Sequence, residues 1–429
     1  MRITKRHLLG FAAALPLAWL TACGGGGDNG NDAHVRLVNA SPGYASLDMY
    51  IDDDKEASAV NFGAGSDYAD VANGEPDRVL TAAGSTTELL NQAGSLDSGK
   101  RYTVVAYGWE GALKSVIMTD DEDSADTDKT KVSALNLAID AGELDVYLTA
   151  EGDDLAAATP VAGGVDAGAQ TSFTSVSSGT YRLRVTAAGS KTDIRLDVSG
   201  VVLSSKDVLT LVMAPGSGGV LVHAIGVVQE GDVTSYLNTK ARARVVAAVA
   251  DAGTVSLSAG GVGLASNVKS ATIRDYVLVN SGAQTVHTVV NGTALTDQSV
   301  TFAAGADVTL LVSGTGAGDA TVHAIADDDR LPTVSTQYKL RLVHAAPTLA
   351  AENLSMTIDF SAVASDLDFG SASTFSAQTA SSAATIDITT PSSGSIYNVT
   401  DVNLLAKGIY TMFMFDTING PVGVLRKER

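Results

Sequence analysis

The feature that most constrains this chain is a pattern that recurs about every 100 residues. A strand-like run late in each repeat contains a threonine, and these threonines are spaced 107, 99 and 102 residues apart: Thr103, Thr210, Thr309 and Thr411. An identical Val-His-Ala-Ile string starts at positions 222 and 322, which predicts equivalent strand positions for His223 and His323. About 100 residues are enough for a separate hydrophobic core. The repeat therefore predicts four modules arranged like beads, each folding on its own.

The first module opens on two strand patterns joined by a tight turn. Residues 35–51 read V-R-L-V-N-A-S-P-G-Y-A-S-L-D-M-Y-I, and imperfect copies open later modules. Apolar residues alternate with polar ones on both sides of the turn, which is the period of a strand with one buried face. If the two strands are neighbours, Arg36 and Asp48 would form a cross-strand ion pair worth about 0–1 kcal/mol. Arg341 and Asp359 would be the counterpart in the fourth module.

Strand patterns follow one another about every ten residues, and no segment has the apolar spacing of a helix. Six to eight strands in about 100 residues fit a two-sheet sandwich of the immunoglobulin-like size class. We therefore predict an all-β fold, built as a tandem array of four immunoglobulin-like antiparallel β-sandwich modules. The predicted modules span residues 33–128, 129–238, 239–333 and 334–429.

The N-terminal segment is organised like an export signal. Residues 1–22 combine a basic start with an apolar run that ends in Leu-Thr-Ala, directly before the only cysteine, Cys23. These four residues resemble the bacterial lipobox, which implies cleavage before Cys23 and membrane attachment through lipid on its thiol; the alternative is an ordinary signal peptide. Residues 23–32 are then the lipidated cysteine and a flexible Gly-rich tether. Because Gly24 follows the cysteine, the predicted location is the outer membrane of the bacterial cell envelope.

The strand motifs also carry a family resemblance. Residues 35–42 and 47–51, together with 102–106, 179–185 and 342–347, resemble the bacterial family called domain of unknown function 4397. The match is good in modules 1 and 2, partial in module 4 and weak in module 3. The resemblance implies exported β-sandwich repeats on a bacterial lipoprotein, and it supplies no activity.

The chain is acidic, with 28 basic and 48 acidic residues and a formal net charge of −20, so we expect it to repel nucleic acid. Two acidic runs lie where modules should join, and their carboxylates are candidate Ca²⁺ ligands: Asp120, Asp121, Asp123, Asp126, Asp128, Asp327, Asp328 and Asp329. The sequence favours the alternative of a hydrated, self-repelling linker, because the first run lacks the Gly and Glu of the twelve-residue Ca²⁺ loop. No other cofactor is expected.

Aromatic residues gather in the first module, where Trp109 is the only tryptophan outside the predicted leader. An exposed patch of Trp109, Tyr107 and Tyr50 would let the module stack sugar rings or anchor a protein partner. The sequence favours the alternative that these side chains pack in the core and along edge strands.

No established catalytic motif is present, neither a Gly-x-Ser-x-Gly elbow nor a His-Glu-x-x-His helix nor a phosphate-binding loop. Histidines that recur at one place in several repeats favour structural roles. The sequence therefore predicts a non-enzymatic cell-envelope lipoprotein, acting as a surface stalk or as a binding or adhesion module for an unknown protein or polysaccharide. The alternative is binding of carbohydrate or envelope polymer through the aromatics of module 1, and a hydrolase is the hypothesis with least support.

Overall fold

The computed structural model describes residues 32–429, in which every regular element is a strand or a short 3-10 helix. Each of the four modules is a sandwich of two sheets, which confirms the predicted all-β tandem array. We call the sheet that contains a module's first strand the inner sheet, and the other the outer sheet. The predictions about the leader, Cys23 and most of the tether fall outside the described residues.

In module 1 the inner sheet has the order β4-β1-β7-β8 and the outer sheet β3-β2-β5-β6. Its strands are β1 (Ala33–Asn39), β2 (Ser46–Ile51), β3 (Asp54–Asn61), β4 (Ala69–Val71), β5 (Asp77–Ala82), β6 (Glu88–Ala93), β7 (Arg101–Trp109) and β8 (Ala112–Thr119). In module 2 the inner sheet has the order β12-β9-β15-β16-β17 and the outer sheet β11-β10-β13-β14. Its elements are β9 (Lys129–Asn136), η1 (Ile139–Ala141), β10 (Leu144–Thr149), η2 (Leu155–Ala157), β11 (Ala162–Val165), β12 (Thr174–Ser177), β13 (Gly179–Ala187), β14 (Ile194–Leu203), β15 (Val208–Pro215), β16 (Val222–Val228) and β17 (Val233–Tyr236).

In module 3 the inner sheet has the order β21-β18-β26-β27, with β22 also on β18, and the outer sheet β20-β19-β23-β24, with β25 also on β23. Its strands are β18 (Lys240–Val249), β19 (Thr254–Ala259), β20 (Val262–Lys269), β21 (Thr272–Ile273), β22 (Val277–Asn280), β23 (Gly282–Val290), β24 (Thr293–Ala294), β25 (Gln298–Phe302), β26 (Asp307–Gly314) and β27 (Thr321–Asp327). In module 4 the inner sheet has the order β31-β28-β34-β35 and the outer sheet β30-β29-β32-β33. Its elements are β28 (Gln337–Ala345), η3 (Pro347–Leu349), β29 (Leu354–Ile358), β30 (Ser361–Leu367), β31 (Ser376–Thr379), β32 (Ser381–Thr390), β33 (Gly394–Leu404), β34 (Ile409–Thr417) and β35 (Gly420–Lys427).

The sandwiches are not wholly antiparallel, which corrects one part of the prediction. In every module the first strand pairs in parallel with the late strand that carries the recurring threonine. The register partners are Arg36 and Thr103, Ser133 and Thr210, Arg244 and Thr309, and Arg341 and Thr411. The threonine repeat therefore marks one fixed position in the inner sheet of each module.

The two strands of the opening motif are not neighbours, so the predicted ion pair between Arg36 and Asp48 is wrong. β1 and β2 lie in opposite sheets, and the Ser-Pro-Gly turn is a corner between them. Arg36 is buried, and Asp48 binds Lys55 at 2.7 Å within the outer sheet. The counterpart in module 4 is also wrong, because Asp359 accepts from the backbone N–H of Thr385.

Each module has its own apolar core between its two sheets, as predicted, but the modules are not independent beads. A further cluster joins the inner sheets of modules 1 and 2, and contains Val38, Val105, Met118, Leu135, Val212 and Ile225. Another joins modules 3 and 4, and contains Val246, Leu311, Ile325, Val343, Phe413 and Phe415. All eight residues of β15 and all eight of β26 are buried, because these strands face their own core on one side and the partner module on the other.

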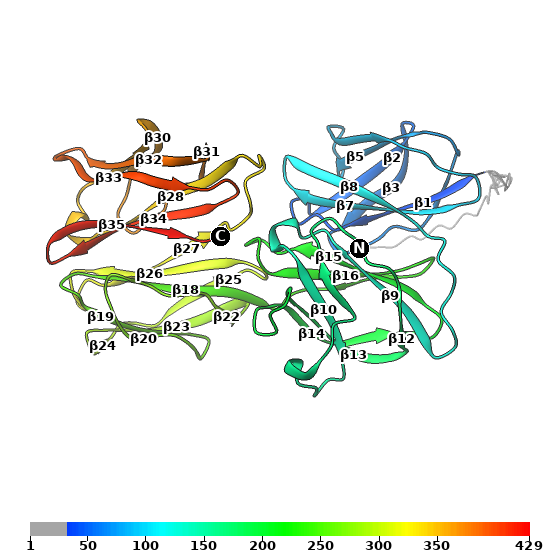
Figure 1. Cartoon of the computed structure of the whole chain (residues 1–429), viewed down its shortest axis with the longest axis horizontal. Helices are drawn as coiled ribbons and strands as arrows, with labels where there is room; N and C mark the ends of the chain where they lie inside the picture. The colour runs from blue at the N-terminus through cyan, green and yellow to red at the C-terminus, as the bar shows by residue number, and fades with distance from the viewer. Residues whose placement is uncertain (1–31) are drawn as a thin grey trace, which may run out of the picture.

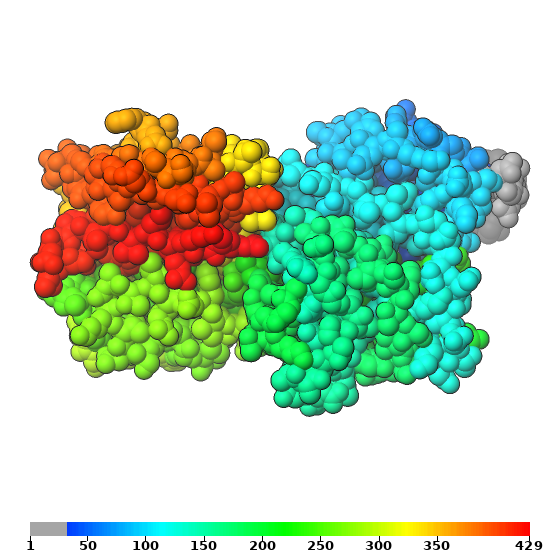
Figure 2. Space-filling view, in the orientation of Figure 1, coloured from blue at the N-terminus to red at the C-terminus, as the bar shows by residue number. Residues whose placement is uncertain are grey.

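The four modules form two pairs that lie side by side (Figure 1). Modules 1 and 2 are stacked at the right of the view and modules 3 and 4 at the left, so the chain turns back and module 4 lies beside module 1. Figure 2 shows the resulting block, with a shallow constriction between the pairs. The pairs touch through backbone as well as side chains, since the N–H of Gly218 donates to the carbonyl of Gly305 at 2.9 Å.

Candidate functional site

A buried polar network connects the paired inner sheets in modules 1 and 2. The Arg36 Nε donates to the Thr103 hydroxyl at 2.8 Å, and that hydroxyl donates to an Asp120 oxygen at 2.6 Å. Tyr68 donates to the same oxygen at 2.6 Å, and the Arg36 guanidinium lies 4.6 Å from its ring centroid. Burial and the bond to Asp120 raise the pKa of Tyr68 to about 12. Arg36 then crosses the interface and donates to the carbonyl of Val228 in module 2 at 2.8 Å.

Module 3 repeats this network residue for residue. Arg244 donates to Thr309 at 2.8 Å, and both Thr309 and Tyr276 donate to the same oxygen of Asp327, each at 2.6 Å. The Arg244 guanidinium lies 4.6 Å from the Tyr276 ring centroid. Its two terminal nitrogens each donate to one carboxylate oxygen of Glu428 in module 4, both at 2.7 Å. The charged side chains of Arg244 and Glu428 therefore bind each other across the interface between modules 3 and 4.

Module 4 contributes to the same interface from the opposite side. Arg341 donates to the carbonyl of Ala326 at 3.0 Å and to the carboxylate of Asp327, both in module 3. Burial would raise the pKa of Asp327, but the charges of Arg341 and Arg244 outweigh it and hold that pKa below its ordinary value. The carboxylate is therefore charged, buried and fully engaged by protein donors.

The acidic runs are not brought together as a ligand set. Asp327 and Asp329 are buried, so the hydrated-linker interpretation is wrong for the second run. Asp328 binds Arg330 and Asp329 binds Arg242, whereas most of the first run is exposed. Within residues 32–429 no group of three or more His, Cys, Asp and Glu side chains is placed to hold a metal ion. Ca²⁺ binding stays a prediction.

The two histidines of the repeated string are not equivalent, which corrects the sequence alignment. His223 lies opposite Ala214, four residues after Thr210, whereas His323 lies opposite Leu311, two residues after Thr309. When the two threonines are aligned, the Val-His-Ala-Ile strings are therefore offset by two residues. His223 is buried against Phe62 of module 1, with ring centroids 5.6 Å apart, and burial lowers its pKa to about 4. His223 is therefore part of an interface.

Trp109 lies where the two pairs meet and does not form an exposed aromatic pair. Its indole N–H donates to Asp140 of module 2 at 2.8 Å, and the Arg330 guanidinium lies 4.5 Å from its ring centroid. A cavity of about 360 Å³ opens beside it, lined by Tyr107, Trp109, Lys114, Ile139, Leu331 and Lys407. Tyr50 is not part of this site, because it lies in the outer sheet beside Lys55.

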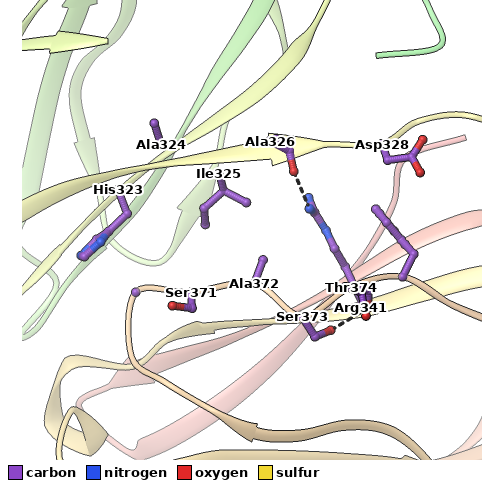
Figure 3. A pocket seen from close by; sticks show the side chains of 12 residues that line it. His323, Ala324, Ile325, Ala326, Asp328, Arg341, Ser371, Ala372, Ser373 and Thr374 are labelled. Carbon is purple, nitrogen blue, oxygen red and sulfur yellow. Dashed lines mark hydrogen bonds between the residues drawn. The ribbon is translucent and has the colours of Figure 1, made fainter. Parts of the chain in front are cut away.

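A second cavity, of about 720 Å³, lies between modules 3 and 4 (Figure 3). One wall is the edge strand β27, from His323 to Ala326, and the other is the segment 370–375 that leads into β31. Arg341 crosses between the walls to reach the carbonyl of Ala326. Most of the lining side chains are small, so they leave space along the groove for an elongated ligand.

Neither cavity assembles a nucleophile with a base and an orienting acid. His34 binds Asp70 and His287 binds Asp297, and neither histidine has a hydroxyl or thiol partner in the described part of the chain. His323 does contact a hydroxyl, that of Thr321 at 2.8 Å, but its other ring nitrogen has no carboxylate partner there.

The polar networks were not predicted, although the chain carries a sequence signal for them. Arg36 and Tyr68 are 32 residues apart, and so are Arg244 and Tyr276. The two pairs are offset by 208 residues, which is the length of two modules rather than one. The chain is therefore a duplicated pair of modules as well as four repeats.

Comparison with known proteins agrees with this duplication. The family model described as domain of unknown function (DUF4397) matches residues 33–147 and 241–355, two segments that begin 208 residues apart. No curated protein matches the chain. Among solved structures, the carbohydrate-binding module CBMbc (family CBM26) from Eubacterium rectale Amy13K, crystallised with maltoheptaose, is 10% identical. The alignment covers 48% of this chain and 96% of that one, and its TM-score of 0.16 is too low to support an argument. Between residues 32 and 429 no helix is long and apolar enough to cross a bilayer.

Proposed function

Because this chain belongs to the family described as domain of unknown function (DUF4397), we propose a function from its geometry: a non-enzymatic, lipid-anchored envelope protein whose modules form a rigid head that binds a partner. The observation that carries the proposal is the pair of apolar clusters between inner sheets. They fix the grooves between modules in one shape, and a preformed groove loses less entropy when it binds.

The arrangement of the modules favours a head over a stalk. A stalk gains length by placing modules end to end, whereas here the chain folds back into two adjacent pairs (Figure 1). Each pair buries apolar residues and charged groups that a string of separate beads would leave in water. The outcome is a compact block with grooves at its module boundaries.

The anchor is proposed from sequence. The proposal is supported by the apolar run before Cys23 and by the Gly-rich residues 24–32, which precede β1, a strand that starts at Ala33. Several acyl chains on one residue hold a protein stably at a bilayer. We propose that the head is displayed from the outer membrane by this tether.

We expect Cys23→Ser to move the protein from the membrane fraction to the soluble fraction without changing the melting temperature of the head. The measurement is fractionation of intact cells combined with labelling by a fatty-acid probe. Asn29→Ser, a substitution in the same segment, serves as the matched control and should leave the protein in the membrane fraction. A Cys23→Ser protein that stays membrane-bound would overturn the anchor.

Carbohydrate binding is the second candidate, and the cavity beside Trp109 favours it. The lining of the cavity combines two aromatic side chains with Lys114 and Lys407, which suits an acidic sugar. Trp109 is the only tryptophan outside the leader, so its fluorescence reports on this site. We expect a saturable emission change with oligogalacturonate, weakened by Lys114→Gln and unaffected by Lys55→Gln. The same response with a neutral oligosaccharide would contradict the role of the lysines.

A further inference from the structure

The groove in Figure 3 has an unpaired strand edge as one of its walls. In the described sheets β27 pairs only with β26, so its other edge has no strand partner; of the backbone groups there, the Ala326 carbonyl already accepts from Arg341. Segment 370–375 faces this edge across the cavity of about 720 Å³. Exposed strand edges are templates for a further strand.

Modules 1 and 2 contain the same kind of groove, and there it is filled. The strand β17 pairs antiparallel with β16 on the edge that faces module 1. A Cβ added at Gly65 of module 1 would lie 2.6 Å from Val233 Cγ2, and one at Gly63 would lie 2.9 Å from Ser235 Cβ. The four-residue strand β17 therefore fits between β16 and the facing loop of the partner module.

The facing loops of the two grooves are built alike. The N–H of Gly63 donates to the carbonyl of Asn39 at 2.8 Å, and the N–H of Gly370 donates to that of His344 at 3.0 Å. Both glycines have a positive φ, +79° and +76°. Three residues further on, Ser66 and Ser373 each bind the first strand of their module through both backbone and hydroxyl. Segment 370–375 is thus the counterpart of segment 63–68.

The strands β16 and β27 also correspond in register. Thr210 faces Val227 in module 2 and Thr309 faces Ile325 in module 3, so Val227 and Ile325 are equivalent. β17 pairs with residues 224–227, whose counterparts are 322–325. Residues 323–325 all line the open groove.

The two grooves are related by the approximate two-fold symmetry of a module pair. Arg36 of module 1 donates to the carbonyl of Val228, at the end of β16 in module 2. Arg341 of module 4 makes the equivalent bond to Ala326, at the end of an edge strand in module 3. The groove beside β27 therefore has the same two walls as the groove that β17 fills, but no strand of the described chain lies between them.

We propose that this groove binds an extended polypeptide segment of a partner protein, which adds to β27 as an antiparallel strand. The proposal rests on the binding-head function and names its ligand class. The small side chains of Ala324, Ala326 and Ala372 suit a segment of small and β-branched residues, like Val-Thr-Ser in β17. The ring of His323 lies against Gly370, as Ser235 of β17 lies against Gly63, so it closes that end of the groove.

The test uses the full chain with Cys23→Ser, so that it can be studied without lipid, and a capped peptide with the sequence of residues 232–237, Asp-Val-Thr-Ser-Tyr-Leu. We expect millimolar peptide to shift the backbone amide NMR signals of residues 323–326 and 370–375, and no others. Ala372→Phe, which fills the groove, should weaken binding by about tenfold or more. Ala362→Phe, the same change at an exposed site, should not.

A peptide carrying Thr234→Pro is the ligand control, because proline removes a donor from the ladder and should not bind. The absence of shifts with the parent peptide would overturn the proposal, as would shifts along β16, which would mean displacement of β17. Concentration-dependent dimers abolished by Ala372→Phe would also overturn it, because the occupant would then be a second copy of this chain. The fractionation test of Cys23→Ser does not depend on the peptide experiment. Failure of the strand site can therefore be distinguished from failure of the proposed anchored head.

Discussion

Phe413→Ala is expected to lower the free energy of unfolding of the module 3–4 pair by about 3–5 kcal/mol. The side chain is fully buried at the centre of the cluster between the two inner sheets, stacked on Phe415 with centroids 5.9 Å apart. Its removal leaves a cavity in an interface between two already folded sandwiches. Such an interface can open instead of collapsing, so we expect the two modules to separate as well as to lose stability.

Phe360→Ala is the matched control for this substitution, because the side chain of Phe360 is 98% exposed. Its effect should stay within about 0.5 kcal/mol. Denaturant unfolding gives the free energies, and small-angle scattering detects separation of the modules as a larger radius of gyration. Equal effects of the two substitutions would mean that the inner sheets do not hold the pair together.

The local rules of strand structure were sufficient to predict the sandwiches. Alternation of apolar and polar residues holds in outer strands such as β19, whose burial also alternates, because one face packs on the core and the other meets water. The period of the threonines was a reliable guide to the repeat, since each lies opposite the same position of the first strand.

The pairing of modules was missed because it depends on strands that break the alternation. β15, β26 and β34 each contain a nearly continuous apolar run, and such runs indicate a strand buried on both faces. In an isolated sandwich one face of each sheet meets water, so a strand with apolar residues on both faces would expose part of them. As markers of the repeat alone, these runs predict independent modules; as strands buried on both faces, they predict paired modules.

The candidate sites were harder to predict, because each combines residues from several modules. Trp109 was identified from its rarity, but its partners Asp140 and Arg330 lie 31 and 221 residues away along the chain. The groove beside β27 has no motif at all, since its walls are backbone edges and small side chains. Only the register of the modules reveals that β17 fills the equivalent place.

Arg341→Met is expected to cost about 3–5 kcal/mol at neutral pH, because it leaves the Asp327 carboxylate buried without its closest cation. The side chains of Arg341 and Asp327 are 3% and 1% exposed, and Arg244 stands further off, 4.0 Å from the same carboxylate. Arg182→Met is the matched control, since Arg182 and Asp197 pair at 2.6 Å with 31% and 24% exposure. Breaking a partly exposed pair should cost only about 0–1 kcal/mol.

The pH dependence separates loss of charge from loss of packing in this variant. Arg341 and Arg244 hold the pKa of Asp327 below its ordinary value of 3.8, so the stability they provide is complete above that value and is lost as pH falls through the folded-state pKa. Without Arg341 the folded-state pKa of Asp327 rises, and the carboxyl takes up its proton at a higher pH. The difference between Arg341→Met and the parent chain should therefore be largest near pH 7 and shrink towards pH 3, as measured by urea unfolding. A difference that does not change with pH would assign the role of Arg341 to its packing on Phe375, 4.7 Å from the guanidinium, instead of to its charge.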